Sequence, residues 1–223
     1  VSVDLSGNEK LVSINMCNNK KLLSVDLSGD AMLESVELGN NENLESVNFD
    51  GCNQLTSLSL EGCAITDLDL NGCTQLSYLN CGNNQLTSLD LSFAEQLNSL
   101  YVSGNQLVEL NLKNTSHLIN LQCSGNQLTA LDMQSNQKLV SLECGGNRLD
   151  TLDVTGMPEL EVLDCSGNNL VELDVTKNLS LLRIDCYGNP LTKLDISKNK
   201  KLEGLNINFT RITALDATAN EQL

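Results

Sequence analysis

The chain of 223 residues contains no tryptophan, only 3% aromatic residues and two prolines. With so few large side chains, the core must consist of small aliphatic residues, mainly leucine. Such a core suits a narrow interior better than a bulky globular centre. The single histidine, His117, stands in a predicted surface bend. Because it is isolated, the chain lacks the usual general base for a serine or cysteine nucleophile.

Basic residues are scarce as well. The chain has 13 Lys and Arg against 29 Asp and Glu, which gives a formal net charge of −16 at pH 7. This charge argues against a surface that neutralises the phosphates of DNA or RNA, and equally against binding to an anionic membrane. No apolar stretch approaches the roughly 20 residues needed to cross a bilayer. We therefore expect no nucleic-acid partner and no direct membrane insertion.

The nine cysteines contain no C-x-x-C pair, so neither a zinc site nor a compact disulfide framework is indicated. Cys123, Cys144, Cys165 and Cys186 recur at one inward position of the repeat described below. Parallel, in-register side chains lie a little too far apart for easy disulfide bonding. We expect buried, reduced thiols that act as small apolar fillers, with Cys17 as the best candidate for a reactive thiol. No metal site and no cofactor is expected.

Leucine and asparagine recur at one fixed interval along most of the chain. The leucines are at positions 55, 76, 97, 118, 139, 160, 181, 202 and 223, and the asparagines are Asn84, Asn105, Asn126, Asn147, Asn168 and Asn189. A fixed period of this length indicates a solenoid. We expect residues 1–223 to form a single domain, in which the period of the turns is 22 in 1–54 and 21 from 55 on. The chain begins and ends within a repeat, and solenoids need polar caps, so it is predicted to be a segment of a longer protein.

Each turn contains two short apolar-polar-apolar segments, which are predicted strands. Alternate segments define two faces. Face A contains the segments that begin at Ile14, Val36, Leu58, Leu79, Leu100, Leu121, Leu142, Leu163, Ile184 and Leu205, and face B contains those that begin at Val3, Val25, Val47, Leu68, Leu89, Leu110, Leu131, Leu152, Leu173, Leu194 and Leu215. Equivalent strands of successive turns would pair about 4.8 Å apart, with leucines inward and the middle residue outward. The predicted fold is a mainly β, right-handed coil with parallel sheets on two faces and little or no α-helix.

The asparagines and glycines have predicted structural tasks. A buried amide can satisfy the backbone groups that turn inward at each bend, so the asparagines should form a ladder. The glycines that precede them, such as Gly104 and Gly125, fit a bend whose backbone conformation glycine tolerates best.

Residues 139–149, LVSLECGGNRL, followed by Leu152-Asp153-Val154, resemble a leucine-rich repeat of the nested bacterial subtype called IRREKO. The resemblance covers nearly the whole chain. It implies a secreted or cell-surface bacterial protein, often from Bacteroidetes, with roles such as adhesion and with binding on the concave sheet. The longer turns before residue 55, and the cysteines in the asparagine position at 52, 63 and 73, depart from the pattern.

The outward positions of face A form the candidate ligand surface. The predicted binding residues are Tyr78, Asn80, Tyr101, Asn120, Gln122, Glu143, Asp164, Arg183, Asp185 and Tyr187. Exposed tyrosines with amide and hydroxyl neighbours suit a protein or glycan partner, although the same residues could be a merely solvated surface. We expect a monomeric, non-enzymatic recognition module. The alternative is a structural spacer or adhesin stalk without its own ligand.

Two sets of carboxylates suggest further alternatives. Glu143, Asp164 and Asp185 fall on consecutive turns, at spacings that glycoside hydrolysis or calcium binding could use, so a carbohydrate-active solenoid is the third hypothesis. An open sheet argues against it, because exposed carboxylates keep near-normal acidity.

On face B the outward row is almost uniformly Asp, including Asp132, Asp153 and Asp174. Local hydrogen bonds from the following Ser or Thr are expected to offset their repulsion, with at most weak binding of divalent cations.

Overall fold

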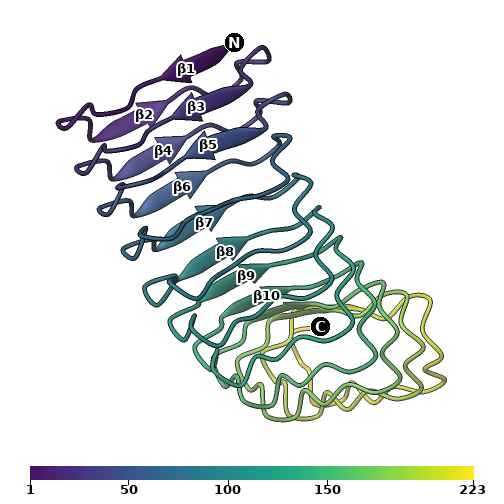
Figure 1. Cartoon of the computed structure of the whole chain (residues 1–223). Coiled ribbons are helices and arrows are strands. Elements are labelled where there is room, and N and C mark those ends of the chain that lie inside the picture. The colour runs from purple at the N-terminus through teal and green to yellow at the C-terminus, as the bar shows by residue number, and fades with distance from the viewer.

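The computed structural model describes residues 1–223 as stacked turns of coil with short strands and no helix (Figure 1). The strands are β1 (Ser2–Asp4), β2 (Ser13–Asn15), β3 (Ser24–Asp26), β4 (Ser35–Glu37), β5 (Ser46–Asn48), β6 (Ser57–Ser59), β7 (Tyr78–Asn80), β8 (Ser99–Tyr101), β9 (Asn120–Gln122), β10 (Ser141–Glu143), β11 (Val162–Asp164), β12 (Arg183–Asp185) and β13 (Gly204–Asn206). The predicted mainly β solenoid is therefore confirmed.

Face A is a continuous parallel sheet of ten strands, in the order β13-β12-β11-β10-β9-β8-β7-β6-β4-β2. Equivalent residues of successive turns are in register, as Leu100, Leu121 and Leu142 show. These leucines are completely buried, whereas Asn120 and Gln122 on either side of Leu121 are partly exposed. The predicted assignment of inward and outward positions is correct.

The expected sheet on face B is much shorter than predicted. It contains only β1, β3 and β5, and from Leu68 on the face B segments form no backbone hydrogen bonds to neighbouring turns. Their leucines are also less completely covered, with 7% of Leu110 and 8% of Leu152 exposed, compared with 0% of Leu100. A sheet on each face is therefore present only in the first turns.

The change follows the shortening of the turn by one residue. In the longer turns Val47 follows the buried Asn41 by six positions, whereas in the shorter turns Leu89 follows Asn84 by five. In both kinds of turn a cross-turn bond is made before the face B segment, as when the Glu45 amide donates to the Leu23 carbonyl and the Gln85 amide donates to the Ile65 carbonyl, both over 2.9 Å. Only in the shorter turns does the segment itself then continue without a paired neighbour. Periodicity shows which side chains are buried, but not whether the backbones between them come close enough to bond.

The recurring asparagines form the predicted ladder along the bend after each face A strand. The Asn105 side-chain amide donates to the carbonyls of Cys81 and Val102 over 3.0 Å each, and its oxygen accepts from the Leu86 amide at 3.0 Å. Asn126 and Asn147 repeat the same three bonds one turn further on. Each amide thus links two turns, so the ladder supports the sheet that it borders.

A second, less complete ladder follows face B. Asn178, Asn199 and Asn220 each donate to two main-chain carbonyls of the preceding turn, but their side-chain oxygens are buried without a hydrogen-bond partner. Asp30 occupies the equivalent position in an earlier turn. It is fully buried, and neither of its carboxylate oxygens has a partner.

The bend before the first ladder has a left-handed backbone conformation, as the glycines predicted. Gly104, Gly125 and Gly146 have φ values of 68°, 65° and 63°. A Cβ atom at Gly125 would approach the backbone of Gly104 to 3.6 Å, so successive bends are closely stacked. The same position is held by Phe209, with φ 56°. A bulky side chain in this region is a genuine outlier.

The cysteines fill the core, as expected. All nine are free thiols, and all except Cys17 are buried. Burial raises the pKa of the Cys81 and Cys123 thiols to about 12. At neutral pH these side chains are therefore protonated and behave as small apolar groups.

Native alkylation should therefore modify Cys17 alone. Treating the folded protein with a maleimide at neutral pH is expected to add one label, because only Cys17 is accessible, whereas labelling in urea should add nine. Intact-mass spectrometry measures both numbers, and a Cys17→Ser variant that takes up no label while folded is the control. Labelling of Cys123 in the folded protein would contradict this assignment.

Candidate binding surface on the ten-stranded sheet

All ten predicted binding residues lie on the outward side of face A. They form three parallel rows across the strands. The central row contains Asn80, Tyr101, Gln122, Glu143, Asp164 and Asp185, and the row at the strand starts contains Tyr78, Asn120 and Arg183. The third row lies just beyond the strand ends and contains Tyr187, two residues after the end of β12. Arg183 and Tyr187 are exposed and the others are partly exposed. No other segment of the chain covers these rows, so the sheet offers a continuous polar surface.

Aromatic pairs stand near both ends of this surface. The rings of Tyr78 and Tyr101 lie 5.5 Å apart between centroids and are tilted by 46°. The rings of Tyr187 and Phe209 lie 5.2 Å apart, edge to face, and Phe209 is 80% exposed. Aromatic side chains that are exposed but fixed against each other can contribute contact area without losing much conformational freedom on binding.

The three carboxylates of the central row are in register on β10, β11 and β12. Each is held by a local hydrogen bond. Glu143 accepts from the Gln122 side chain at 2.9 Å, Asp164 from the Ser166 amide at 2.9 Å, and Asp185 from both the Tyr187 amide and the Asn206 side chain at 2.9 Å. Such fixed, partly exposed acceptors suit recognition of hydrogen-bond donors better than proton transfer.

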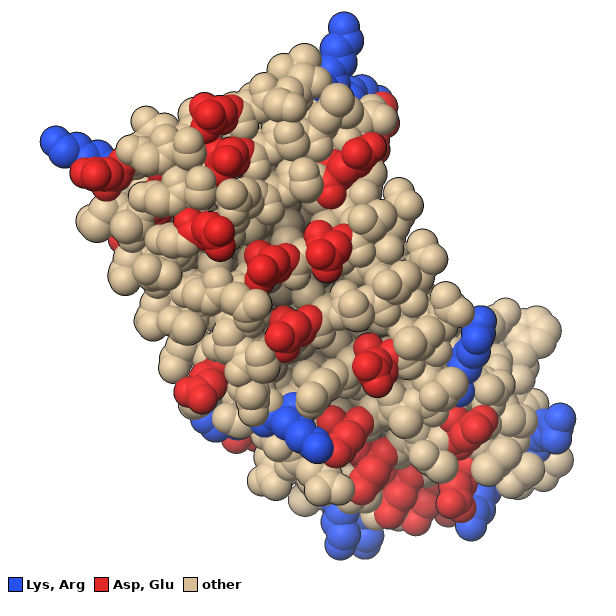
Figure 2. Space-filling model, in the orientation of Figure 1, with Lys and Arg blue, Asp and Glu red and all other residues tan.

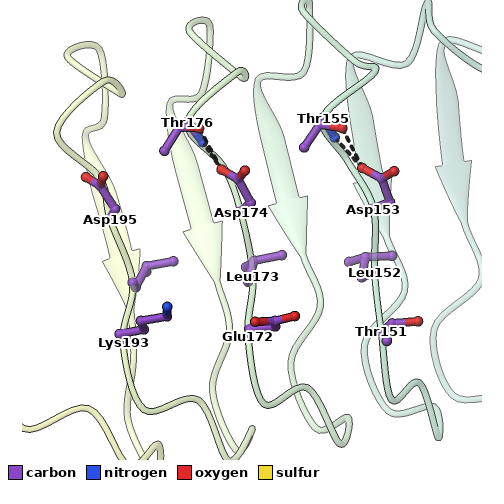
Figure 3. Close-up of a pocket in the computed structure, with 11 residues that line it drawn as sticks. Thr151, Leu152, Asp153, Thr155, Glu172, Leu173, Asp174, Thr176, Lys193 and Asp195 are labelled. Carbon is purple, nitrogen blue, oxygen red and sulfur yellow. Dashed lines mark hydrogen bonds between the residues drawn. The ribbon is translucent and has the colours of Figure 1, made fainter.

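The main surface hollows lie elsewhere. One is on face B between three successive turns, where it is lined by Leu152, Leu173 and Leu194 together with polar neighbours (Figure 3). This hollow lies where the face B segments of successive turns form no backbone hydrogen bonds with one another. The structure contains no group of three or more His, Cys, Asp or Glu side chains that could hold a metal ion.

The acidic row of face B is stabilised as the sequence predicts. Asp153 accepts bonds from the amide and the hydroxyl of Thr155 at 2.9 and 2.7 Å, and Asp174 accepts the equivalent bonds from Thr176 (Figure 3). These bonds to the Thr side chain and amide lower the pKa of both Asp carboxyls. These carboxylates therefore already accept hydrogen bonds from residues of their own turn.

Sequence reasoning did not identify two residues of the face A surface. Glu61 follows β6 and accepts hydrogen bonds from the Asn80 and Asn83 side chains at 3.0 and 3.3 Å. Phe209 packs against Tyr187. Phe209 could have been found, because it stands one turn after Gly188 and interrupts the glycine period. Glu61 belongs to an outward row of mostly small residues and carried no such signal.

A family model identifies part of the repeat. Residues 53–95 match the family described as leucine-rich repeats, in two copies. This segment is a leucine-rich repeat. It includes β6 and β7, and the same strand register and asparagine ladder continue through the following turns. No curated protein is similar enough in sequence to match the chain.

Solved structures show the same leucine-rich-repeat fold over nearly the whole chain. The functional domain of InlJ from Listeria monocytogenes, which includes a cysteine ladder, is 26% identical, with a TM-score of 0.62 over 96% of this chain and 57% of that one. A leucine-rich-repeat protein of Leptospira interrogans is 20% identical, with a TM-score of 0.68 over 86% and 68%. TLR13 in complex with ssRNA13 is 17% identical, with a TM-score of 0.59 over 100% and 46%. The chain thus spans little more than half of the InlJ chain that it matches.

Stacked cysteines are a feature that this solenoid shares with the InlJ domain. Cys123, Cys144, Cys165 and Cys186 occupy equivalent positions of four successive turns and are fully buried.

The structure has no helix long and apolar enough to span a bilayer.

Proposed function

We propose that this leucine-rich-repeat solenoid is a non-enzymatic recognition module that binds a protein or glycan partner through face A. The uncovered ten-stranded sheet is the observation that carries the proposal. Its outward rows combine fixed tyrosines with amides and carboxylates whose positions are set by the register of the strands. The site of action that fits the family resemblance is the cell surface or the extracellular space.

The net charge of the chain and the open shape of the sheet argue against two classes of function. A net charge of −16 disfavours polyanions, so we do not carry over the RNA of the TLR13 complex. The glycosidase alternative needs two carboxyl groups in a cleft, whereas Glu143, Asp164 and Asp185 stand on an open sheet and already accept local hydrogen bonds. The spacer alternative predicts that substitutions on face A affect no binding event.

Alanine at the tyrosines tests the function. We expect the soluble chain to retain a partner on an array of proteins and glycans, and Tyr78→Ala with Tyr101→Ala to weaken that binding at least about tenfold, because tyrosines are enriched among the residues that contribute most to interface energy. Surface plasmon resonance measures the change in Kd.

The matched control removes exposed apolar side chains away from the sheet. Val108→Ala with Val171→Ala takes away residues that are 59% and 58% exposed, and it should leave the Kd within about twofold. Equal losses in both double variants, or a chain that retains no partner at all, would favour the spacer.

A further inference from the structure

The Tyr78–Tyr101 pair is a fixed aromatic platform on face A. Tyr78 opens β7 and Tyr101 closes β8, so their side chains meet diagonally across two neighbouring strands. The centroids are 5.5 Å apart and both residues are partly buried. Aromatic ring faces carry negative electrostatic potential. The platform therefore attracts a cation that approaches from the solvent.

Two carboxylates lie beside this platform, on the side of β6 and β4. Glu37 lies in the same outward row as Tyr101, with only Ser59 and Asn80 between them. Glu61 is held beside Asn80 by the bond between the two side chains. Burial raises the pKa of the Tyr78 hydroxyl, the Asn80 side chain opposes this rise, and the charges of Glu37 and Glu61 add smaller increases.

No cation of the chain neutralises these carboxylates. The only ion pair in the structure joins Lys20 to Glu42. Between Lys21 and Lys113 the sequence contains no Lys or Arg, although Asp and Glu recur throughout. In Figure 2, acidic side chains extend along the middle of the molecule, whereas basic side chains are confined to the regions toward the two ends. A uniformly negative surface steers positively charged partners toward it.

We propose that Tyr78, Tyr101, Glu37 and Glu61 form a seat for an arginine or lysine side chain of an extended, basic segment of a protein partner. The proposal rests on the proposed function and names the chemistry of its partner. The cationic group lies against the tyrosine rings and pairs with the two carboxylates, while neighbouring residues of the segment contact the outward amides of face A. Arginine is preferred to lysine, because its planar guanidinium can both stack on a ring and form paired hydrogen bonds to a carboxylate.

The test uses the full chain and synthetic peptides of about ten residues, a length of roughly 33 Å when extended. One peptide alternates Arg with Ser, and its two counterparts carry Gln or Glu in place of Arg. The protein has no tryptophan and only three tyrosines. In a Tyr187→Phe background, all tyrosine fluorescence therefore reports on Tyr78 and Tyr101. We expect the Arg peptide to change this emission and to bind with an affinity that falls as salt is added, and the Gln and Glu peptides to leave it unchanged.

Substitutions that remove a negative charge but keep the size of the side chain distinguish a specific site from general electrostatic attraction. Glu37→Gln with Glu61→Gln removes two charges from the seat, and Asp153→Asn with Asp174→Asn removes two from face B. The first variant should weaken the Arg peptide at least about tenfold and the second less than about twofold. Because Glu37 is partly exposed and Glu61 is exposed, the first variant should keep the native melting temperature, so a loss of binding would not come from unfolding.

Two outcomes overturn the proposal. If the two double variants weaken the Arg peptide equally, the attraction comes from net charge alone. If the Arg peptide leaves the tyrosine emission unchanged, there is no cationic seat. In that case a partner on the array that still depends on Tyr78 and Tyr101, such as a neutral glycan, would leave the proposed recognition function intact. The absence of any such partner would remove both.

Discussion

Leu121→Asp is expected to abolish cooperative folding of the central turns. Leu121 is completely buried between Leu100 and Leu142 of the adjacent strands. Truncation of such a leucine to alanine costs about 2–5 kcal/mol, and an unpaired buried carboxylate costs more. Each turn of a solenoid is supported only by its neighbours, so the damage should spread along the coil. Circular dichroism during heating and in urea measures the loss.

The control for this prediction is one residue away. Asn120→Asp places the same charge on the same strand, but its side chain is outward and partly exposed, next to Ser99 and Ser141. We expect a change of less than about 1 kcal/mol. If both variants were equally stable, the assignment of inward and outward positions would be wrong.

Asp30→Asn should stabilise the protein. Asp30 occupies a position of the second ladder where Asn178 and Asn199 donate to main-chain carbonyls of the neighbouring turn. An ionised carboxylate has no proton to donate, and both of its oxygens are without a partner. An amide of the same size supplies the missing donors, and a gain of about 1–3 kcal/mol at pH 7 is expected, measurable by urea unfolding.

The shifted pKa of Asp30 determines how the stabilisation by Asp30→Asn should change with pH. Burial raises the pKa of the Asp30 carboxyl above 3.8; the dipole of the nearby Asn8 backbone N–H opposes this rise, and the charge of Asp26 adds a smaller increase. The folded state therefore binds this proton more tightly than the unfolded state. The contribution of Asp30 to stability is fully present below pH 3.8 and is lost as pH rises through the folded pKa. The advantage of Asp30→Asn should accordingly grow with pH and then level off.

Asp26→Asn is the matched control for this comparison. The Asp26 carboxylate is partly exposed and accepts a bond from the Ser28 amide at 2.9 Å. An asparagine oxygen can accept the same bond, so the substitution should change stability by less than about 0.5 kcal/mol. Destabilisation by Asp30→Asn would show instead that the native carboxylate is bound by a group that prefers a negative charge.

Much of the architecture could be predicted because one constraint repeats in every turn. Leu100 and Leu121 are inward, and Asn105 and Asn126 bridge the turns, since a side chain that recurs once in every turn occupies the same place in each coil. The extent of the second sheet could not be predicted. Whether the segments at Leu68 and Leu89 bond to each other depends on the path of the connecting residues, which hydrophobic periodicity does not describe.

The candidate site was only partly predictable for a related reason. Alternation along each strand identified the outward residues, including Tyr78 and Tyr101. The partners of these residues lie on other turns, and Glu61 becomes part of the surface only through its bonds to Asn80 and Asn83. The unfavourable environment of Asp30 was equally invisible, because an acidic residue in a repeat otherwise rich in Asp gives no sign that it is buried.

The unequal extent of the two sheets gives the molecule a stiff part and a compliant part. Around β1 to β5 the turns are joined by a sheet on both faces, whereas beyond Leu68 only face A has a continuous sheet. Opening the grooves between Leu152, Leu173 and Leu194 breaks no sheet hydrogen bond and acts on ladder bonds such as those from Asn178 and Asn199, so we expect this region to bend more easily than the first turns. A ligand lying across β7 to β12 therefore meets a surface that can flatten or tighten around it while its strand pairing stays intact.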